Sequence, residues 1–165
     1  MFEPENRKSY IAVCITLWSI LSYLTITHYI VMAVEIQGAS MSPTLLDGDK
    51  FLLNRFEYLY RPPHRGEIIV LRDPEDHGLS IKRIIGMPGE AFEIRREGIF
   101  INGEKFEEPY LSPESRKATS HKLIPRKVLG ENEFYVLGDN RDFSADSRVY
   151  GPLPVNAVLG HIPSH

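Results

Sequence analysis

The feature that most constrains this chain is a long uncharged run near its amino terminus. Of the 26 residues from Ser9 to Val34, 19 are apolar and none is Asp, Glu, Lys or Arg. As a helix rising about 1.5 Å per residue, the run would reach about 39 Å, more than the roughly 30 Å hydrocarbon core of a bilayer. The apolar region of a cleaved secretory signal is shorter, and a helix packed on a soluble core keeps a polar stripe that this run lacks. We therefore expect an uncleaved transmembrane anchor over residues 9–34.

The charges that flank this run predict its orientation. Arg7 and Lys8 directly precede it, and Glu35 directly follows it. The positive-inside rule then places a short tail, residues 1–8, in the cytoplasm and residues 35–165 on the outer face of a plasma membrane. The expected protein is single-pass, with the lipid bilayer as one partner.

Outside the run, the composition is that of an ordinary soluble domain. The other 139 residues include 51 apolar residues and all 41 charged ones, which is enough for one modest core. The net charge of -3 gives no basic footprint for nucleic acid. The single cysteine, Cys14, excludes a disulfide scaffold and a zinc site built from several cysteines. The stretch Asp73–His77 could hold a cation only loosely, so we expect no metal site.

Beyond the anchor, short β-like runs alternate with turn residues, and no long amphipathic helix is predicted. Turns are indicated by sequences such as Pro88-Gly89 and Asn102-Gly103. Regularly spaced short strands favour a mainly β domain, a compact β-barrel or sandwich, over a parallel sheet. The expected strands are Lys50–Asn54, Glu67–Leu71, Ser80–Ile85, Ala91–Arg96, Gly98–Ile101, Glu133–Leu137 and Val158–Ile162.

Two segments fit no strand pattern. Phe56–Tyr60 could be a helical turn or a loop. Ser112–Lys127 is polar, basic and bracketed by prolines, so we expect residues 112–127 to form a long loop or a hairpin excursion. A basic ligand patch is the alternative for this second segment, and a solvated loop is the preferred interpretation.

Two clusters of residues have the chemistry of a nucleophile and a base. The first, Gly38–Leu45, is a small polar turn fixed by a proline, in which Ser40 could expose its Oγ and its backbone N–H. The second places Lys82 in a run of isoleucines that favours a buried strand. Burial would lower the pKa of this lysine, whereas an ordinary strand lysine extends to the edge of the sheet. Arg83 points to the opposite face by strand alternation and is expected to stay in water.

A third cluster follows the predicted strand Glu133–Leu137. The eleven residues Gly138–Arg148 include three aspartates, two arginines, two serines and an asparagine. This density suits a loop held by its own hydrogen bonds and by an Asp–Arg pair. Because none of the three clusters contains a histidine, we expect a serine activated by a lysine, a known variant of the serine–histidine–aspartate triad.

Together these clusters resemble the type I signal peptidase family. Its motifs are a Ser-Met-x-Pro-Thr box behind a membrane anchor, a Gly-Asp strand, a Lys-Arg box that ends in Gly-x-Pro-Gly-(Asp/Glu), and a final Gly-Asp-Asn box. Four such boxes in order are highly specific, and the resemblance covers nearly the whole chain. This sequence has SMSPT at 40–44, GDKFLLNR at 48–55, KRIIGMPGE at 82–90 and GDNRDFSADSR at 138–148.

The resemblance implies a role for each of several residues. It makes Ser40 the nucleophile and Lys82 the neutral general base, with the backbone N–H of Ser40 stabilising the oxyanion. Many members add a hydroxyl donor two positions before the nucleophile, where this chain has Gly38. The supporting roles fall in the third cluster: Ser144 would hydrogen-bond the lysine amine, Asp146 and Arg148 would pair, and Asp139 and Asn140 would help to build the loop.

The implied reaction is hydrolysis of one peptide bond by a serine endopeptidase, which releases exported preproteins from their signal peptides. The substrate would bind extended, as a strand added to a sheet edge, and no cofactor would take part. Two other functions stay open. One is a catalytically silent, membrane-tethered adaptor that binds export substrates. The other is a self-cleaving serine–lysine regulator, which would need a DNA-binding helix-turn-helix where this chain has its apolar run.

Overall fold

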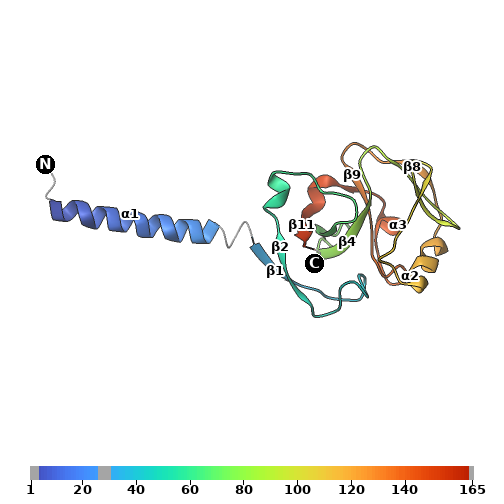
Figure 1. The fold of residues 1–165 in the computed structure, drawn as a ribbon, viewed down its shortest axis with the longest axis horizontal. Coiled ribbons are helices and arrows are strands. Elements are labelled where there is room, and N and C mark those ends of the chain that lie inside the picture. The colour runs from blue at the N-terminus through green and yellow to red at the C-terminus, as the bar shows by residue number, and fades with distance from the viewer. Residues whose placement is uncertain (1–3, 26–30, 164–165) are drawn as a thin grey trace.

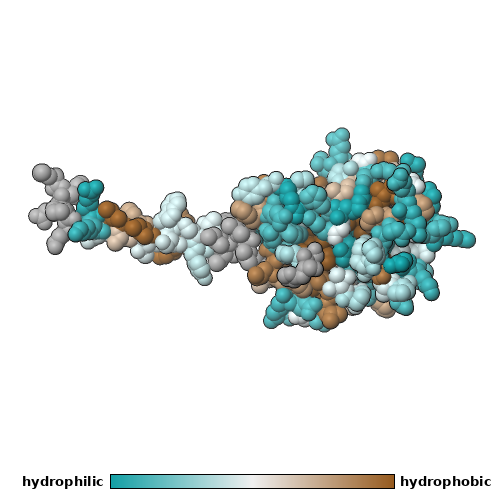
Figure 2. All heavy atoms as spheres, viewed as in Figure 1, coloured by the Kyte–Doolittle hydropathy of each residue, from teal (hydrophilic) through white to brown (hydrophobic). Residues whose placement is uncertain are grey.

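The computed structural model of the protein describes residues 4–25 and 31–163. It comprises one long amino-terminal helix, α1 (Pro4–Thr25), and a mainly β body from which the helix extends (Figure 1). The stretch Arg7–Thr25 of this helix is long and apolar enough to cross a membrane, and none of it is buried against the body. Figure 2 shows hydrophobic side chains exposed along the helix.

The predicted anchor over residues 9–34 is wrong at its carboxyl end. The helix ends at Thr25, and Val31–Glu35 forms strand β1; residues 26–30 lie outside the described residues. The end of the apolar run belongs to the sheet because β1 pairs antiparallel with the next strand along its whole length, and Val34 is buried in a core cluster. Apolar composition alone does not distinguish one long anchor from a shorter helix followed by a buried strand.

The strands of the body form two antiparallel sheets within the described residues. The larger sheet has the order β1-β2-β11-β3-β4-β9-β10, and the smaller has the order β7-β6-β5-β8. The remaining strands of the larger sheet are β2 (Lys50–Asn54), β3 (Ile68–Arg72), β4 (Leu79–Gly86), β9 (Glu133–Leu137), β10 (Leu153–Pro154) and β11 (Val158–Ile162). Those of the smaller sheet are β5 (Ala91–Arg95), β6 (Gly98–Ile101), β7 (Glu104–Phe106) and β8 (Ile124–Val128).

The prediction of a mainly β domain is confirmed, with the larger sheet curled. Each of the seven predicted strands is present, with its ends within one residue of the expected ones. The sequence interpretation misses β1, β7, β8 and β10. Short helical segments complete the body: η2 (Glu57–Leu59), which is the helical turn considered for Phe56–Tyr60, α3 (Ser147–Tyr150) and η4 (Val155–Ala157).

The prediction of a loop or hairpin excursion over residues 112–127 is wrong. This segment forms helix α2 (Pro113–Ala118), the 3-10 turn η3 (Thr119–His121) and most of β8. Ser112 caps the helix by accepting a 3.2 Å hydrogen bond from the backbone N–H of Ser115. Strand β8 pairs with β5, but almost all of its side chains are exposed, so it has no apolar alternation by which the sequence could predict a strand.

Strand β4 is the element that joins the two sheets and places the central lysine. It lies between β3 and β9 in the larger sheet, and its last residue leads through a tight turn into β5. A Cβ at Gly86 would lie 2.6 Å from Leu129 Cδ1 and 2.9 Å from Tyr135 Cβ. Because no side chain fits there, the two sheets pack closely at this bend.

Candidate active site

Ser40 lies in a turn after β1 that is anchored by two apolar side chains. Met41 and Leu45, which both follow Ser40, are buried in the core, and the Leu45 N–H donates a 3.0 Å hydrogen bond to the Met41 carbonyl. The Ser42 N–H donates to the Ala39 carbonyl at 3.1 Å. Ser40 itself stays half-buried, so the rest of the turn holds its hydroxyl at the surface of the body.

Lys82 of β4 brings a buried amine to this hydroxyl. Its side chain is on the same side of the strand as that of Ser80, two residues earlier, and the residue is 3% exposed. The Nζ atom donates hydrogen bonds to Ser80 Oγ at 2.7 Å and to the Ile81 carbonyl at 3.1 Å. Its third close neighbour is Ser40 Oγ, at 3.5 Å. The serine and the lysine singled out from the sequence therefore meet in the structure.

The surroundings of the amine favour its neutral form. Burial lowers the pKa of Lys82 below its ordinary value of 10.5, while the negative charges of Asp146 and Asp73 oppose this by raising it. Burial is the larger effect. The lowered pKa increases the fraction of lysine that can accept a proton near neutral pH.

Arg83 is buried and ion-paired, so the prediction that it stays in water is wrong. Its Nε and Nη2 atoms donate to the two carboxylate oxygens of Asp139 at 2.9 and 2.6 Å. A third donor, Nη1, reaches the Gly66 carbonyl at 2.8 Å, and the guanidinium lies 4.0 Å from the ring centroid of Tyr110. Strand alternation does put Arg83 opposite the lysine, but the body also covers that face, where a buried carboxylate balances the charge.

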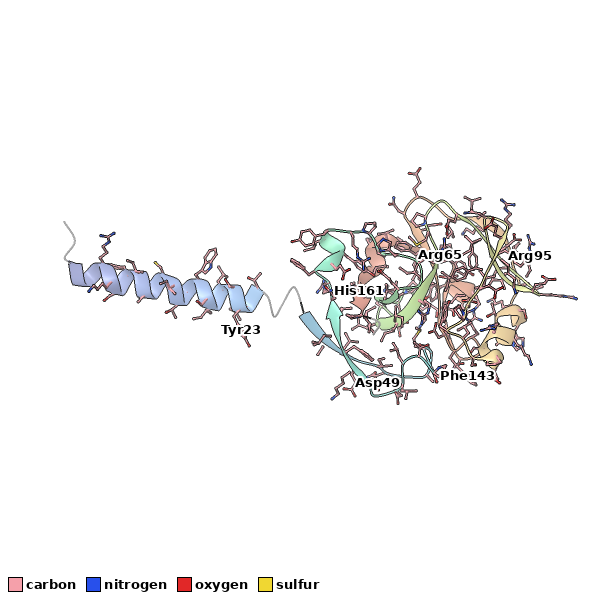
Figure 3. The ribbon with its side chains drawn as sticks, in the orientation of Figure 1. Tyr23, Asp49, Arg65, Arg95, Phe143 and His161 are labelled. Atoms are coloured by element: carbon pink, nitrogen blue, oxygen red, sulfur yellow. The ribbon has the colours of Figure 1, made fainter. Side chains whose placement is uncertain are left out.

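The third sequence cluster, residues 138–148, is hydrogen-bonded to the turn that carries Ser40. Thr44 Oγ1 donates to Asp139 Oδ2 at 2.6 Å. Asn140 donates twice, from its backbone N–H to the Ser40 carbonyl and from its side-chain amide to the Ala39 carbonyl, both at 3.0 Å. Phe143 of this cluster is labelled at the lower side of the body in Figure 3.

Asp146 and Arg148 hold this loop closed. The Nε and Nη2 atoms of Arg148 each donate a 2.9 Å hydrogen bond to the Asp146 carboxylate, which is 0% exposed. The same carboxylate accepts the backbone N–H of Gly138 at 3.0 Å. Arg148 also donates to the Arg141 carbonyl at 2.7 Å. Charge-assisted bonds of this kind are strong when they are shielded from water.

Ser144 does not bond the lysine amine, contrary to the expectation from the family resemblance. Its Oγ atom is buried and has no hydrogen-bond partner in the described part of the chain. The side chain lies instead against Gly138, where a Cβ would approach Ser144 Oγ to 2.2 Å and the Ser40 carbonyl to 2.6 Å. The hydroxyl that bonds the amine belongs to Ser80, whose spacing of two residues from Lys82 on a strand was the available signal.

A buried network that extends beyond the sequence motifs also supports the loop 138–148. Arg141, 2% exposed, donates from Nε to the Gly138 carbonyl at 2.9 Å and from Nη1 to Glu108 Oε2 at 2.9 Å. It also donates to Thr119 Oγ1 at 2.6 Å. Glu108 and Thr119 precede and follow α2, so residues next to this helix support the loop 138–148. Neither residue falls in a recognisable motif.

A groove of about 340 Å³ opens beside Ser40. Two unpaired strand edges border it. Strand β1 pairs only with β2 among the described strands, and residues 79–82 of β4 pair only with β3, because pairing with β9 begins at Arg83. The groove is lined by Ala33, Val34, Glu35, Ile36, Gln37, Ser40, Met41, Leu79, Ser80 and Ile81.

The carboxylates near Asp73 stabilise a turn in the structure. Asp73 Oδ1 accepts the Glu75 N–H at 2.9 Å, and Asp76 Oδ1 accepts the Gly78 N–H at 2.8 Å. Within residues 4–25 and 31–163, no group of three or more His, Cys, Asp or Glu side chains is placed to hold a metal ion.

Comparison with known proteins identifies the family. Residues 7–164 match the family described as signal peptidase, peptidase S26. Signal peptidase I V of Bacillus subtilis (strain 168) is 31% identical over 153 residues, which cover 87% of this chain and 90% of that protein. Signal peptidase IB of Staphylococcus aureus (strain Mu50) is 30% identical over 147 residues, covering 81% and 76%. The crystal structure of a signal peptidase I from Enterococcus faecalis V583 has a TM-score of 0.54 at 30% identity, covering 62% of this chain and 98% of that one.

A curled β body in which a serine faces a buried lysine fits the class of serine hydrolases in which a lysine takes the place of the histidine. The match over nearly the whole chain makes the class specific: the chain belongs to the signal peptidase family, peptidase S26. The family, the mainly β fold and the enzyme class expected from the sequence are confirmed.

Proposed function

We propose that this chain is a membrane-anchored serine endopeptidase that removes signal peptides from exported preproteins. The observation that carries the proposal is the 3.5 Å approach of Lys82 Nζ to Ser40 Oγ. It occurs beside an open groove, in a family whose relatives are named signal peptidase I. A hydroxyl next to a buried amine has the arrangement of an activated nucleophile and its base.

In the proposed reaction, the neutral amine of Lys82 removes the hydroxyl proton of Ser40 while Oγ bonds to the carbonyl carbon of the scissile peptide. The carbonyl electron pair moves to oxygen and gives a tetrahedral oxyanion. When this intermediate collapses, the C–N bond breaks, and the lysine ammonium gives its proton to the leaving nitrogen. The signal peptide is left as an ester on Ser40. A water molecule that Lys82 deprotonates then hydrolyses the ester and restores both side chains.

The oxyanion donor we assign is the backbone N–H of Ser40. Among the described residues, no carbonyl or side chain accepts a hydrogen bond from this N–H. Gly38 stands where many family members carry a hydroxyl, and its own N–H donates to Asp47 Oδ1 at 2.8 Å. With one protein donor rather than two, the chemical step should be slower, since one such donor is worth about 3 kcal/mol.

The substrate is proposed to bind as an extended strand in the groove beside Ser40. The unpaired edges of β1 and of residues 79–82 offer backbone donors and acceptors to such a peptide. Side chains of an extended peptide alternate between two faces, so the first and third residues before the cut would both point toward the body. This fits the preference for small side chains at these two positions that the family resemblance implies.

The other site residues act by holding Ser40 and Lys82 in place. Asp139 and Asn140 tie the loop to the serine turn, and Asp146 with Arg148 closes the loop on itself. In this proposal none of them touches the reacting atoms. They are positioning residues, and the reaction needs no metal or other cofactor.

The bilayer is the second proposed partner. The 19 residues Arg7–Thr25 would span about 28 Å as a helix, close to the thickness of a hydrocarbon core. Because Arg7 and Lys8 lie at the amino-terminal end, we propose a cytoplasmic amino terminus and a catalytic body on the outer face of the plasma membrane. The catalytic body would then meet preproteins as they leave the membrane.

The test is mass spectrometry of a model preprotein incubated with the full-length chain in detergent micelles. The wild type should release one mature protein and one signal peptide. Ser40→Ala and Lys82→Ala should each lower the rate by roughly 10⁴-fold or more. Ser120→Ala, which removes an η3 hydroxyl that donates to the Lys117 carbonyl of α2, should process normally. Cleavage by either of the first two variants at the wild-type rate contradicts the proposal.

A further inference from the structure

We propose that Ser80 is the positioning residue for the Lys82 amine, the role that the family resemblance gives to Ser144. The inference rests on the proposed function above and adds a residue from outside the catalytic loop. Ser80 Oγ is 2.7 Å from Lys82 Nζ, the shortest of the amine's three contacts. Ser144 Oγ, by contrast, is buried without a hydrogen-bond partner in the described part of the chain.

The geometry of the three contacts explains why Ser80 matters. A neutral lysine amine has two N–H donors and one lone pair, whereas the ammonium has three donors. The two shorter contacts, Ser80 Oγ at 2.7 Å and the Ile81 carbonyl at 3.1 Å, use the two donors. The lone pair is then left for the third direction, toward Ser40 Oγ at 3.5 Å. Ser80 thereby aims the basic electron pair at the proton that it must accept.

Because Ser80 and Lys82 lie on the same strand, the contact between them is held more rigidly than a contact made from a loop. Ser80 and Lys82 lie two residues apart on β4, and pairing with β3 places them opposite Leu71 and Ile69. Both of these partners are 0% exposed. The distance between the serine and the lysine is therefore fixed by the register of two core strands, and a site built on such elements is held more precisely than one built on loops.

Loss of the Ser80 hydroxyl should change the titration of the lysine as well as its orientation. An oxygen that accepts a hydrogen bond from the amine favours the ammonium form, so removing it lowers the pKa of Lys82. The charges that act on this amine are Asp146 and Asp73, and both stay in place. The limb of the pH–activity profile along which activity rises as Lys82 loses its proton should therefore move to lower pH. A purely structural role for Ser80 would leave this limb unchanged.

The experiment compares Ser80→Ala, Ser80→Thr and Ser144→Ala in the full-length chain, with preprotein cleavage followed across pH. Ser80→Ala should lower kcat about tenfold, the value of one well-placed hydrogen bond, with a smaller change in KM and a limb at lower pH. Ser80→Thr keeps the hydroxyl and should restore both kcat and the limb. Ser144→Ala should leave the limb at its wild-type position. If Ser80→Ala does not fold, Ser80→Cys replaces it in the experiment. Cysteine is nearly equal in size to serine but is a weaker hydrogen-bond acceptor, so the limb should again move to lower pH, by a smaller amount.

Two results would overturn the inference. One is a Ser80→Ala variant whose kcat and whose limb of the pH–activity profile both equal those of the wild type. The other is a shifted limb in Ser144→Ala with none in the Ser80 variants, which would return the role to the loop serine. Lys82→Ala separates these results from failure of the proposed function: an inactive Lys82→Ala beside a normal Ser80→Ala contradicts only the inference, whereas an active Lys82→Ala contradicts the function itself.

Discussion

The backbone N–H of Asn140 donates a 3.0 Å hydrogen bond to the carbonyl oxygen of Ser40, and the side-chain amide of Asn140 donates an equal one to the preceding carbonyl. Two segments that lie far apart in the sequence are joined at Ser40, the proposed nucleophile. The position of Ser40 therefore depends on the loop 138–148 as much as on its own turn.

Asn140→Ala should lower kcat about tenfold and change the melting temperature little. The substitution removes the hydrogen bond to the Ala39 carbonyl but keeps the backbone bond to Ser40, so the turn loosens without unfolding. Preprotein cleavage and thermal unfolding of the same sample measure the two effects. Asn156→Ala, at an exposed position in η4, is the control. Unchanged kcat in Asn140→Ala would show that the side-chain bond does not position the nucleophile.

Asp73→Asn should move the activity profile to lower pH. Activity is expected to rise with pH through the pKa of Lys82, because only the neutral amine accepts a proton. The negative charge of Asp73 raises that pKa, so neutralising it lowers the pKa and yields more neutral amine at a given pH. Asp76→Asn in the same turn is the matched control, since its charge is not among those that act on Lys82. Overlapping profiles for wild type and Asp73→Asn would contradict this assignment.

Lys82→Met should stabilise the fold near neutral pH while abolishing cleavage. The folded-state pKa of Lys82 lies below the ordinary value of 10.5, so between these two values the unfolded chain binds more protons than the folded one. The free energy of unfolding of the wild type therefore rises with pH across this window. The advantage of Lys82→Met should shrink as the pH rises toward the ordinary lysine value of 10.5, as followed by thermal unfolding at successive pH values. A difference that stays constant over this rise would contradict a lowered pKa for Lys82.

Arg83→Met should destabilise the protein strongly, by roughly 3–5 kcal/mol, because it leaves the carboxylate of Asp139 buried without its partner. Arg95→Met is the matched control: the Arg95–Glu93 pair is much more exposed than the Arg83–Asp139 pair, so its loss should cost less than about 1 kcal/mol. Denaturant unfolding of the full-length variants gives both values. Equal costs for the two substitutions would show that the buried pair has no special structural role.

The strands that could be predicted are those whose side chains alternate or are buried on both faces. Ile68–Arg72 and Glu133–Leu137 carry dense apolar residues between turn signals, so their sequences alone predict strands. Strand β8 is different, because it is held by backbone pairing to β5 while its side chains remain in water. Strand β1 could not be predicted for a different reason: its residues are apolar, but they continue the apolar run of α1, so the sequence gives no sign that a strand begins there.

Within the site, the sequence motifs predicted which residues gather but not every contact between them. Ser40 and Lys82 come together as expected, and so do Asp146 and Arg148. The environment of Arg83 was not predictable from strand alternation, which gives the face of a strand and not what covers that face. The family resemblance gave the amine of Lys82 a hydrogen bond to Ser144, but in the structure the amine bonds Ser80. Only the position of Ser80 on β4, two residues before Lys82, indicates this partner.

The central claim is that burial lowers the pKa of the Lys82 amine beside the Ser40 hydroxyl, so that more of this amine is uncharged near neutral pH than for an ordinary lysine. The most direct test is an NMR titration of lysine Cε in the full-length chain labelled with ¹³C-lysine, with the signal of Lys82 identified by its loss in Lys82→Met. We predict that this one signal titrates below the ordinary lysine value of 10.5, because burial lowers the pKa of Lys82. A Lys82 signal that titrates at or above that ordinary value would contradict the account.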